Sequence, residues 1–96
     1  MDDVEHELQE AAGEVLTTVR LGKQLSSAME TRLKLSLHQC ARHWAGSEVV
    51  PKSAANLFID LANGIDACSY AYKGEDAKRI KFFADEIADL VRACVE

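Results

Sequence analysis

Apolar residues recur at spacings of three and four along almost the whole chain. On a helical wheel with 100° per residue, the first half puts its apolar residues on one narrow face, as an amphipathic helix does. This stripe consists of Val4, Leu8, Ala11, Val15, Val19, Met29, Leu33, Leu37, Cys40 and Trp44. Because the stripe keeps its phase throughout, it fits either one helix over about residues 3–45 or two helices.

Gly22 is the point at which two helices would separate. A glycine readily ends a helix, and the Ser27–Glu30 segment has the form of a capping box for a second helix. A second apolar face in this region, which a tight turn or another packing partner would bury, consists of Leu21, Leu25, Ala28 and Leu35.

The second half predicts further helix. Residues 46–52 contain glycine and proline and predict a loop, with Ser53 as the N-cap of the next helix. Gly64 lies beside the next apolar seam and would permit close approach of another helix, and Lys73-Gly74 is a candidate turn. The two seams consist of Ala54, Phe58, Leu61, Ile65, Cys68 and Tyr72, and of Ile80, Phe83, Ile87, Leu90 and Cys94.

We therefore predict an all-α fold, with residues 1–96 forming a single helical domain. Two architectures fit the pattern. One is an antiparallel bundle of four helices of about 20 residues, over about 3–21, 27–45, 53–72 and 76–95. The other is a long helical hairpin that turns at residues 46–52 and dimerises.

Composition and charge narrow the classes of partner. The net charge is −5 and no basic stripe stands out, so we expect no nucleic-acid partner. No apolar run approaches the roughly 18 residues of a membrane span, so we expect no membrane insertion. The first residues are acidic and polar rather than a signal peptide, and three cysteines make no closed disulfide framework. These features predict a cytoplasmic protein, with export without a signal peptide as the alternative.

The clearest candidate for chemistry is the group His38, Cys40 and His43. Cys40 and His43 lie about 60° apart on a helix, but His38 points about 140° away from the stripe that holds Cys40, so the three cannot hold one metal. We expect no metal and no cofactor. His38 could instead accept phosphate in a histidine phosphotransfer domain, although the Ala41-Arg42 that follows fits that pattern poorly.

No other arrangement typical of catalysis is present. There is no Glu-x-x-His, glycine-rich phosphate loop or Cys-x-x-Cys. The spaced arginines and lysine of a helical mutase are also missing. We therefore expect a protein that is not an enzyme.

Three apolar residues fall on the polar side of their helices. Phe82 lies about 150° from the Phe83 seam, and Ile59 and Tyr70 lie opposite the Phe58 seam. Exposed aromatic residues often anchor interfaces because they bury a large area at a low cost in rotamer entropy. The predicted partner-binding residues are Ile59, Asn63, Asp66, Tyr70, Phe82 and Glu86.

Trp44-Ala45-Gly46, near the midpoint of the chain, resembles the motif of the WXG family of small type VII (ESX) secretion proteins. Tyr72 and Asp76 match the Tyr-x-x-x-Asp/Glu signal of that family. The resemblance implies a helical hairpin with Trp44 and Gly46 at its turn, pairing as a homo- or heterodimer, and export without a cleaved signal. Tyr72 comes early for the family, and a further amphipathic segment follows Asp76.

The sequence thus predicts a non-catalytic helical module for protein–protein interaction, which self-associates or binds one protein partner. Its sharper form is a WXG-like secretion protein. The alternatives are a cytosolic four-helix adaptor, inhibitor or immunity-type protein, and a histidine phosphotransfer domain.

Overall fold

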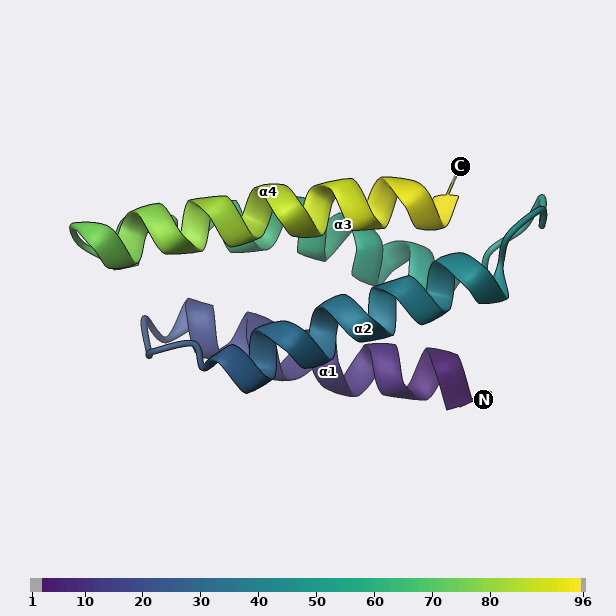
Figure 1. Cartoon of the computed structure of the whole chain (residues 1–96), viewed down its shortest axis with the longest axis horizontal. Coiled ribbons are helices and arrows are strands. Elements are labelled where there is room, and N and C mark those ends of the chain that lie inside the picture. The colour runs from purple at the N-terminus through teal and green to yellow at the C-terminus, as the bar shows by residue number, and fades with distance from the viewer. Residues whose placement is uncertain (1–2, 96) are drawn as a thin grey trace.

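The computed structural model describes residues 3–95, which form four α-helices and one short 3₁₀ helix (Figure 1). The α-helices are α1 (Asp3–Arg20), α2 (Ser27–His43), α3 (Lys52–Ala67) and α4 (Glu75–Val95), and the 3₁₀ helix η1 (Ser69–Ala71) lies between the last two. The all-α prediction is confirmed, in its four-helix form rather than as a hairpin of two long helices.

The bundle consists of two antiparallel hairpins stacked in two layers (Figure 1). α1 packs against α2 in one layer and α3 against α4 in the other, while α1 also contacts α3 and α2 contacts α4. The helices that face each other across the layers run parallel, because the α2–α3 connection crosses from one corner of the bundle to the opposite corner. The radius of gyration, 12.9 Å, is close to the roughly 13 Å expected for a folded chain of this length.

Gly22 separates α1 from α2. It has φ +65°, a left-handed conformation that glycine adopts without steric cost. The N–H of Gly22 donates to the carbonyl of Val19 at 3.1 Å, and the N–H of Lys23 donates to that of Thr18 at 3.1 Å. This pair of bonds is a Schellman motif, which satisfies the last carbonyls of α1. Gly74, immediately before α4, also has a left-handed conformation, with φ +60°, and its carbonyl accepts from the N–H of Lys78 at 3.3 Å.

Three predicted helix ends are wrong by one or more residues. The N-cap of α2 is Ser26 rather than Ser27, and its hydroxyl accepts from the N–H of Met29 at 3.2 Å. α3 begins at Lys52 after Pro51, so Ser53 lies inside the helix, where its hydroxyl donates to Glu5. α3 also ends at Ala67 instead of reaching Tyr72, because the chain tightens into η1.

The core lies between the four helices and contains most of the predicted seam residues. Of the second apolar face, only Leu25 is buried (2% exposed), because the α1–α2 turn folds it inward, while Leu21 and Leu35 remain exposed. The buried core residues of the seams include Leu8, Val15, Val19, Leu33, Leu37, Phe58, Leu61, Ile65, Ile80, Phe83 and Ile87.

Ion pairs join the helices outside the core. Arg32 of α2 donates to Glu7 at 2.7 Å, Glu14 at 2.9 Å and Glu10 at 3.4 Å, all on α1. The hydrogen bond from Arg32 holds the pKa of Glu7 below its usual value. Across the layers, Arg79 donates to Glu30 at 3.0 Å. Because the side chains of Arg32 and its three partners are 38–55% exposed to water, these pairs orient the helices more than they stabilise the bundle.

Gly64 stands where α3 approaches α1. A Cβ added to Gly64 would lie 3.2 Å from Cδ2 of Leu16, which is closer than an ordinary van der Waals contact. The predicted role of Gly64 in close helix approach is therefore confirmed. Gly13, inside α1, has no atom within 4 Å of its added Cβ, so nothing in the packing calls for glycine there.

These two glycines give a matched pair of substitutions. Gly13→Ala should raise the free energy of unfolding by about 0.5–1 kcal/mol, because alanine costs less conformational entropy in a helix. Gly64→Ala should raise the free energy of unfolding by less, because its new methyl group presses on Leu16. Urea denaturation of both variants measures the difference, and equal gains would show that α1 and α3 are not held this closely.

Candidate functional site

The three predicted apolar contact residues are exposed in the folded bundle. Tyr70 is 87% exposed, Phe82 67% and Ile59 60%. Phe82 lies in the first half of α4, Ile59 lies in α3 and Tyr70 lies in η1. The helical wheel thus predicts their exposure correctly, and their role in binding stays a prediction.

The polar residues predicted beside them have different surroundings. Asn63 donates its side-chain N–H to the carbonyl of Ile59 at 3.1 Å, and Asp66 is exposed. Glu86 accepts from Lys34 of α2 at 3.2 Å, so it ties α4 to α2 and is only partly available to a partner.

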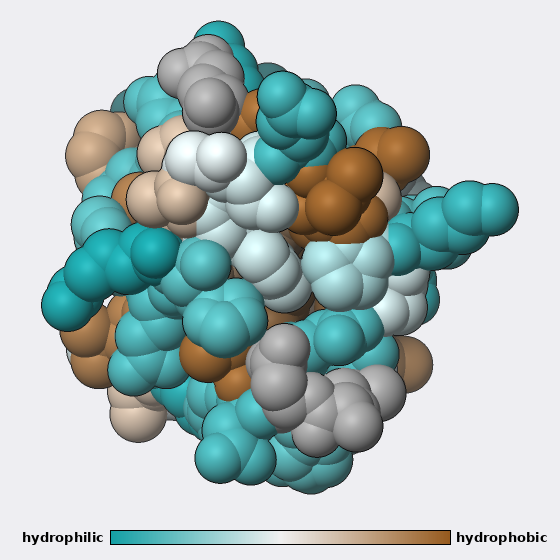
Figure 2. Space-filling view, turned by 90° about the vertical axis from the view of Figure 1, so that its right-hand side faces the viewer, coloured by the Kyte–Doolittle hydropathy of each residue, from teal (hydrophilic) through white to brown (hydrophobic). Residues whose placement is uncertain are grey.

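Further exposed apolar residues do not follow from the sequence pattern. Leu35 on α2 is 57% exposed, Leu21 at the end of α1 is 62% exposed and Val49 in the α2–α3 connection is 77% exposed. The pattern places Leu21 and Leu35 on a face to be buried, and only the observed turn leaves them outside. The end face that carries the α2–α3 connection shows separate apolar patches among hydrophilic atoms (Figure 2).

Trp44 and Gly46 form the end of α2. Trp44 is the C-cap residue, and its N–H donates to the carbonyl of Cys40 at 3.0 Å. Its half-buried ring makes an edge contact with Phe58 of α3, with the ring centroids 6.2 Å apart. Gly46 follows with φ +76°. The motif therefore ends a helix in a left-handed turn, and its indole contacts α3 through Phe58.

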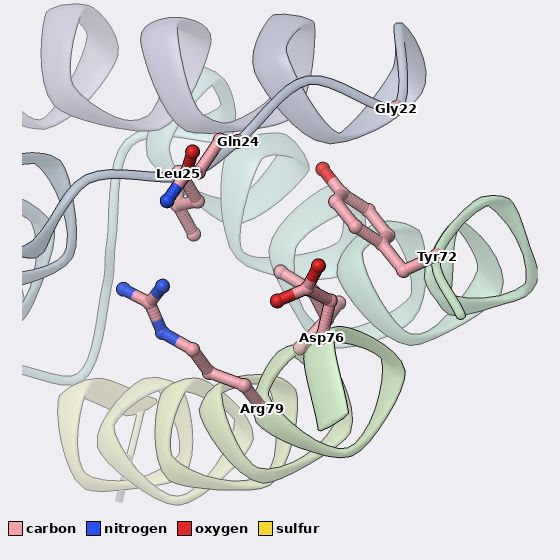
Figure 3. Close-up of a pocket in the computed structure, with 7 residues that line it drawn as sticks. Gly22, Gln24, Leu25, Tyr72, Asp76 and Arg79 are labelled. Atoms are coloured by element: carbon pink, nitrogen blue, oxygen red, sulfur yellow. The ribbon is translucent and has the colours of Figure 1, made fainter. Parts of the chain in front are cut away.

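Tyr72 and Asp76 lie beside a pocket of about 230 Å³ at the opposite end of the bundle. Figure 3 shows the Asp76 carboxylate, the Arg79 guanidinium and the Gln24 amide around its opening. The buried side chains of Leu25 and Ile80 also line it. The volume is below the roughly 300–1,000 Å³ usual for small-molecule sites, so only a small polar group would fit.

The Tyr72 hydroxyl is used inside the fold. It donates to the carbonyl of Lys23 at 2.5 Å, which fastens the chain before α4 to the α1–α2 turn. Burial, together with the negative charges of Cys68 and Asp76 when ionised, raises the pKa of Tyr72 above its usual value. Half-buried Tyr72 is therefore a structural contact between two turns, as its place in the predicted apolar seam suggests, and its role in an export signal stays a prediction.

The group His38, Cys40 and His43 does not converge in the structure. His38 and His43 are exposed on α2, whereas Cys40 is buried in the core. In the part of the chain described, no three histidine, cysteine or acidic side chains are grouped to hold a metal ion. The hypothesis that His38 accepts phosphate stays a prediction.

The last cysteine is also part of the core. The Cys94 thiol donates to the carbonyl of Leu37 at 3.3 Å, and burial raises its pKa to about 11. The thiol therefore stays protonated at neutral pH and acts as a small apolar group with one hydrogen bond.

Among residues 3–95, none of the helices is both long enough and apolar enough to cross a membrane.

Comparisons with known proteins return no match: no family model fits the chain, and no curated protein or solved structure is detectably similar.

The Tyr72 hydrogen bond should contribute measurably to the stability of the fold. Tyr72→Phe should lower the free energy of unfolding by about 1 kcal/mol. Because folding raises the pKa of Tyr72 above 10.0, this contribution is fully present below pH 10 and is lost as the pH rises through the folded-state value. The stabilities of wild type and Tyr72→Phe should therefore converge in alkali.

Tyr70→Phe is the matched control, because the Tyr70 side chain is almost fully exposed. It should change stability by less than about 0.5 kcal/mol. If both variants behave alike at neutral and alkaline pH, the link between Tyr72 and Lys23 does not hold the two turns together.

Proposed function

We propose that this chain is a helical protein–protein interaction module without catalytic activity of its own. The observation that carries the proposal is the exposure of Phe82, Tyr70 and Ile59 on a bundle whose helices already share one core. Leaving such side chains in water gains nothing for the fold, whereas burying each against a partner would remove a large apolar area from water.

The character of the exposed residues supports binding rather than faulty packing. Ile59 and Phe82 have polar neighbours on their own helices, Asn63 beside Ile59 and Asp85 beside Phe82. An aromatic residue within a polar rim is the usual composition of an interface centre. The pockets are less suited to be the main site, because the one beside Tyr72 is small and is lined by residues that hold the turns.

Site-specific photo-crosslinking tests this proposal. Benzoylphenylalanine placed at Phe82 and, separately, at Tyr70 should give a discrete covalent adduct in cells that produce the chain. Mass spectrometry of the adduct identifies the partner as a second copy or another protein.

Thr17, an exposed polar residue of α1, is the control position and should give no discrete adduct. Adducts that are equally abundant from Thr17, or none from Phe82 and Tyr70, would reject the interaction function. Each labelled chain should first show the circular dichroism of the wild type.

A narrower function, as a WXG-like secreted protein, is supported by the position of Trp44 and Gly46 at a turn between two helical hairpins. In such a protein the Tyr72 and Asp76 pair would be part of the export signal. Asp76 is the better residue to test, because it is exposed and a substitution of Tyr72 would also disturb the fold.

Export from a bacterium with a type VII secretion system tests this narrower function. Wild type should reach the medium, Asp76→Asn should lose most of its export, and Asp60→Asn, a matched exposed carboxylate in α3, should be exported normally. Intracellular retention of the wild type, or equal export of the two variants, would dismiss the secretion function while leaving the interaction function in place.

A further inference from the structure

The pocket of about 230 Å³ lies between the two layers of the bundle. Gln24 and Leu25 of the α1–α2 connection form one side of it (Figure 3). Asp76, Arg79 and Ile80, from the first two turns of α4, form the other side. The volume is below that of most small-molecule sites and suits a single small amino-acid residue. A residue bound there would contact both hairpins.

The pocket combines buried apolar walls with a polar opening. Leu25 and Ile80 are only 2% and 3% exposed. The Asp76 carboxylate, the Arg79 guanidinium and the Gln24 amide stand around the opening (Figure 3). A matching ligand has a small apolar end that reaches the walls and polar groups close behind it. An amino-acid residue has this form, because its side chain and its backbone groups leave the same Cα atom.

The opening carries one negative charge that the fold does not compensate. Arg79 donates to Glu30 at 3.0 Å, and the Glu30 side chain is only 16% exposed, so these two groups neutralise each other. Among residues 3–95, the Asp76 carboxylate forms no such ion pair. The ligand that balances the charge of the opening therefore carries one positive charge.

The other charges nearby do not change this sign. Lys23 and Lys73 are exposed in the same two turns, but neither lines the pocket, so water and salt screen their ammonium groups. Glu75, the neighbour of Asp76, pairs with Lys78. The C-terminal end of α1 and the N-terminal end of α4 meet here, and their partial charges have opposite signs. Asp76 thus remains the group that selects the ligand charge.

The first residue of a polypeptide supplies the groups that this opening lacks. Its α-amino group has a pKa of about 7.7–8.0 and is mostly protonated at neutral pH, so it can donate to the Asp76 carboxylate. The carbonyl of the same residue can accept from Arg79. A guanidinium has five N–H donors, and the bond from Arg79 to Glu30 uses one of them.

Two related ligands match the opening less well. A free amino acid adds a carboxylate, which would lie close to the carboxylates of Glu30 and Asp76 and be repelled by them. A residue inside a chain has no ammonium group, so it would leave the charge of Asp76 uncompensated.

We propose that this pocket binds the N-terminal residue of a partner polypeptide, with its ammonium group on Asp76, its carbonyl on Arg79 and a small apolar side chain against Leu25 and Ile80. The inference rests on the proposed interaction function and names one feature of the partner, a free α-amino terminus. The site is separate from Phe82 and adds a second, smaller contact.

Titration of the ¹⁵N-labelled chain with L-valinamide, followed by NMR, tests the pocket. Valinamide carries the ammonium group, the carbonyl and the side chain of an N-terminal valine. It should bind with a dissociation constant of about 1 mM, as expected for a ligand of few atoms, and shift the backbone amides of Gly22, Gln24 and Leu25. N-acetyl-valinamide, which has no ammonium group, and L-valine, which has a carboxylate, should each bind at least about tenfold more weakly.

Asp76→Asn is the decisive variant. It removes the uncompensated charge and should weaken valinamide binding by about tenfold or more, the loss of one charge-assisted hydrogen bond. Glu75→Gln is the matched control, because Glu75 is an exposed carboxylate in the same helical turn that does not line the pocket. It should change the affinity by less than about twofold. Circular dichroism verifies that both variants fold.

Three results would overturn the proposal. They are no binding of valinamide up to about 0.1 M, equal binding of valinamide to wild type and Asp76→Asn, and binding of N-acetyl-valinamide or valine as tight as that of valinamide. If the pocket fails in this way, discrete crosslinks from Phe82 or Tyr70 still support the interaction function. Valinamide binding without any crosslink would instead leave the pocket in place and reject binding through the exposed apolar residues.

Discussion

Gly22 ends α1 in a left-handed conformation, and this turn decides how the apolar stripe of the first half is used. The stripe has the same helical phase before and after the turn, so without the break it would lie along one long helix. The Schellman bonds of Gly22 and Lys23 reverse the chain instead, and α2 returns beside α1. The same turn buries Leu25 and offers the Lys23 carbonyl to Tyr72, which brings the second hairpin to the first.

Much of the fold could be predicted from the sequence because burial follows helical periodicity. Periodicity correctly places most seam residues from Leu8 to Cys94 in the core, and Ile59, Tyr70 and Phe82 on the surface. Helix ends are less predictable, because Ser26 and Ser27 are equally good capping residues. The neighbours across the layers could not be predicted either, since the α2–α3 connection is long enough to reach more than one corner of the bundle.

The candidate site also combines features that periodicity predicts with features that it does not. Periodicity shows which side of a helix a side chain faces, and so it correctly predicts that Phe82 is exposed. It places Tyr72 in the Phe58 seam, but it does not tell what a loop residue meets across space, so the hydrogen bond from the Tyr72 hydroxyl to a turn 49 residues away could not be predicted. The exposure of Leu35 could not be predicted either. Its apolar character suggests burial, and only the observed packing leaves it in water.

The diagonal course of the α2–α3 connection has a consequence for cooperativity. Each hairpin is formed by contacts between neighbours in sequence, while the two layers are joined covalently only through residues 44–51. The layer interface therefore resembles a subunit interface within one chain, and its opening would leave both hairpins intact. Native-state hydrogen exchange would then find two units of protection, and two molecules that open in this way could close again by exchanging hairpins, as a domain-swapped dimer.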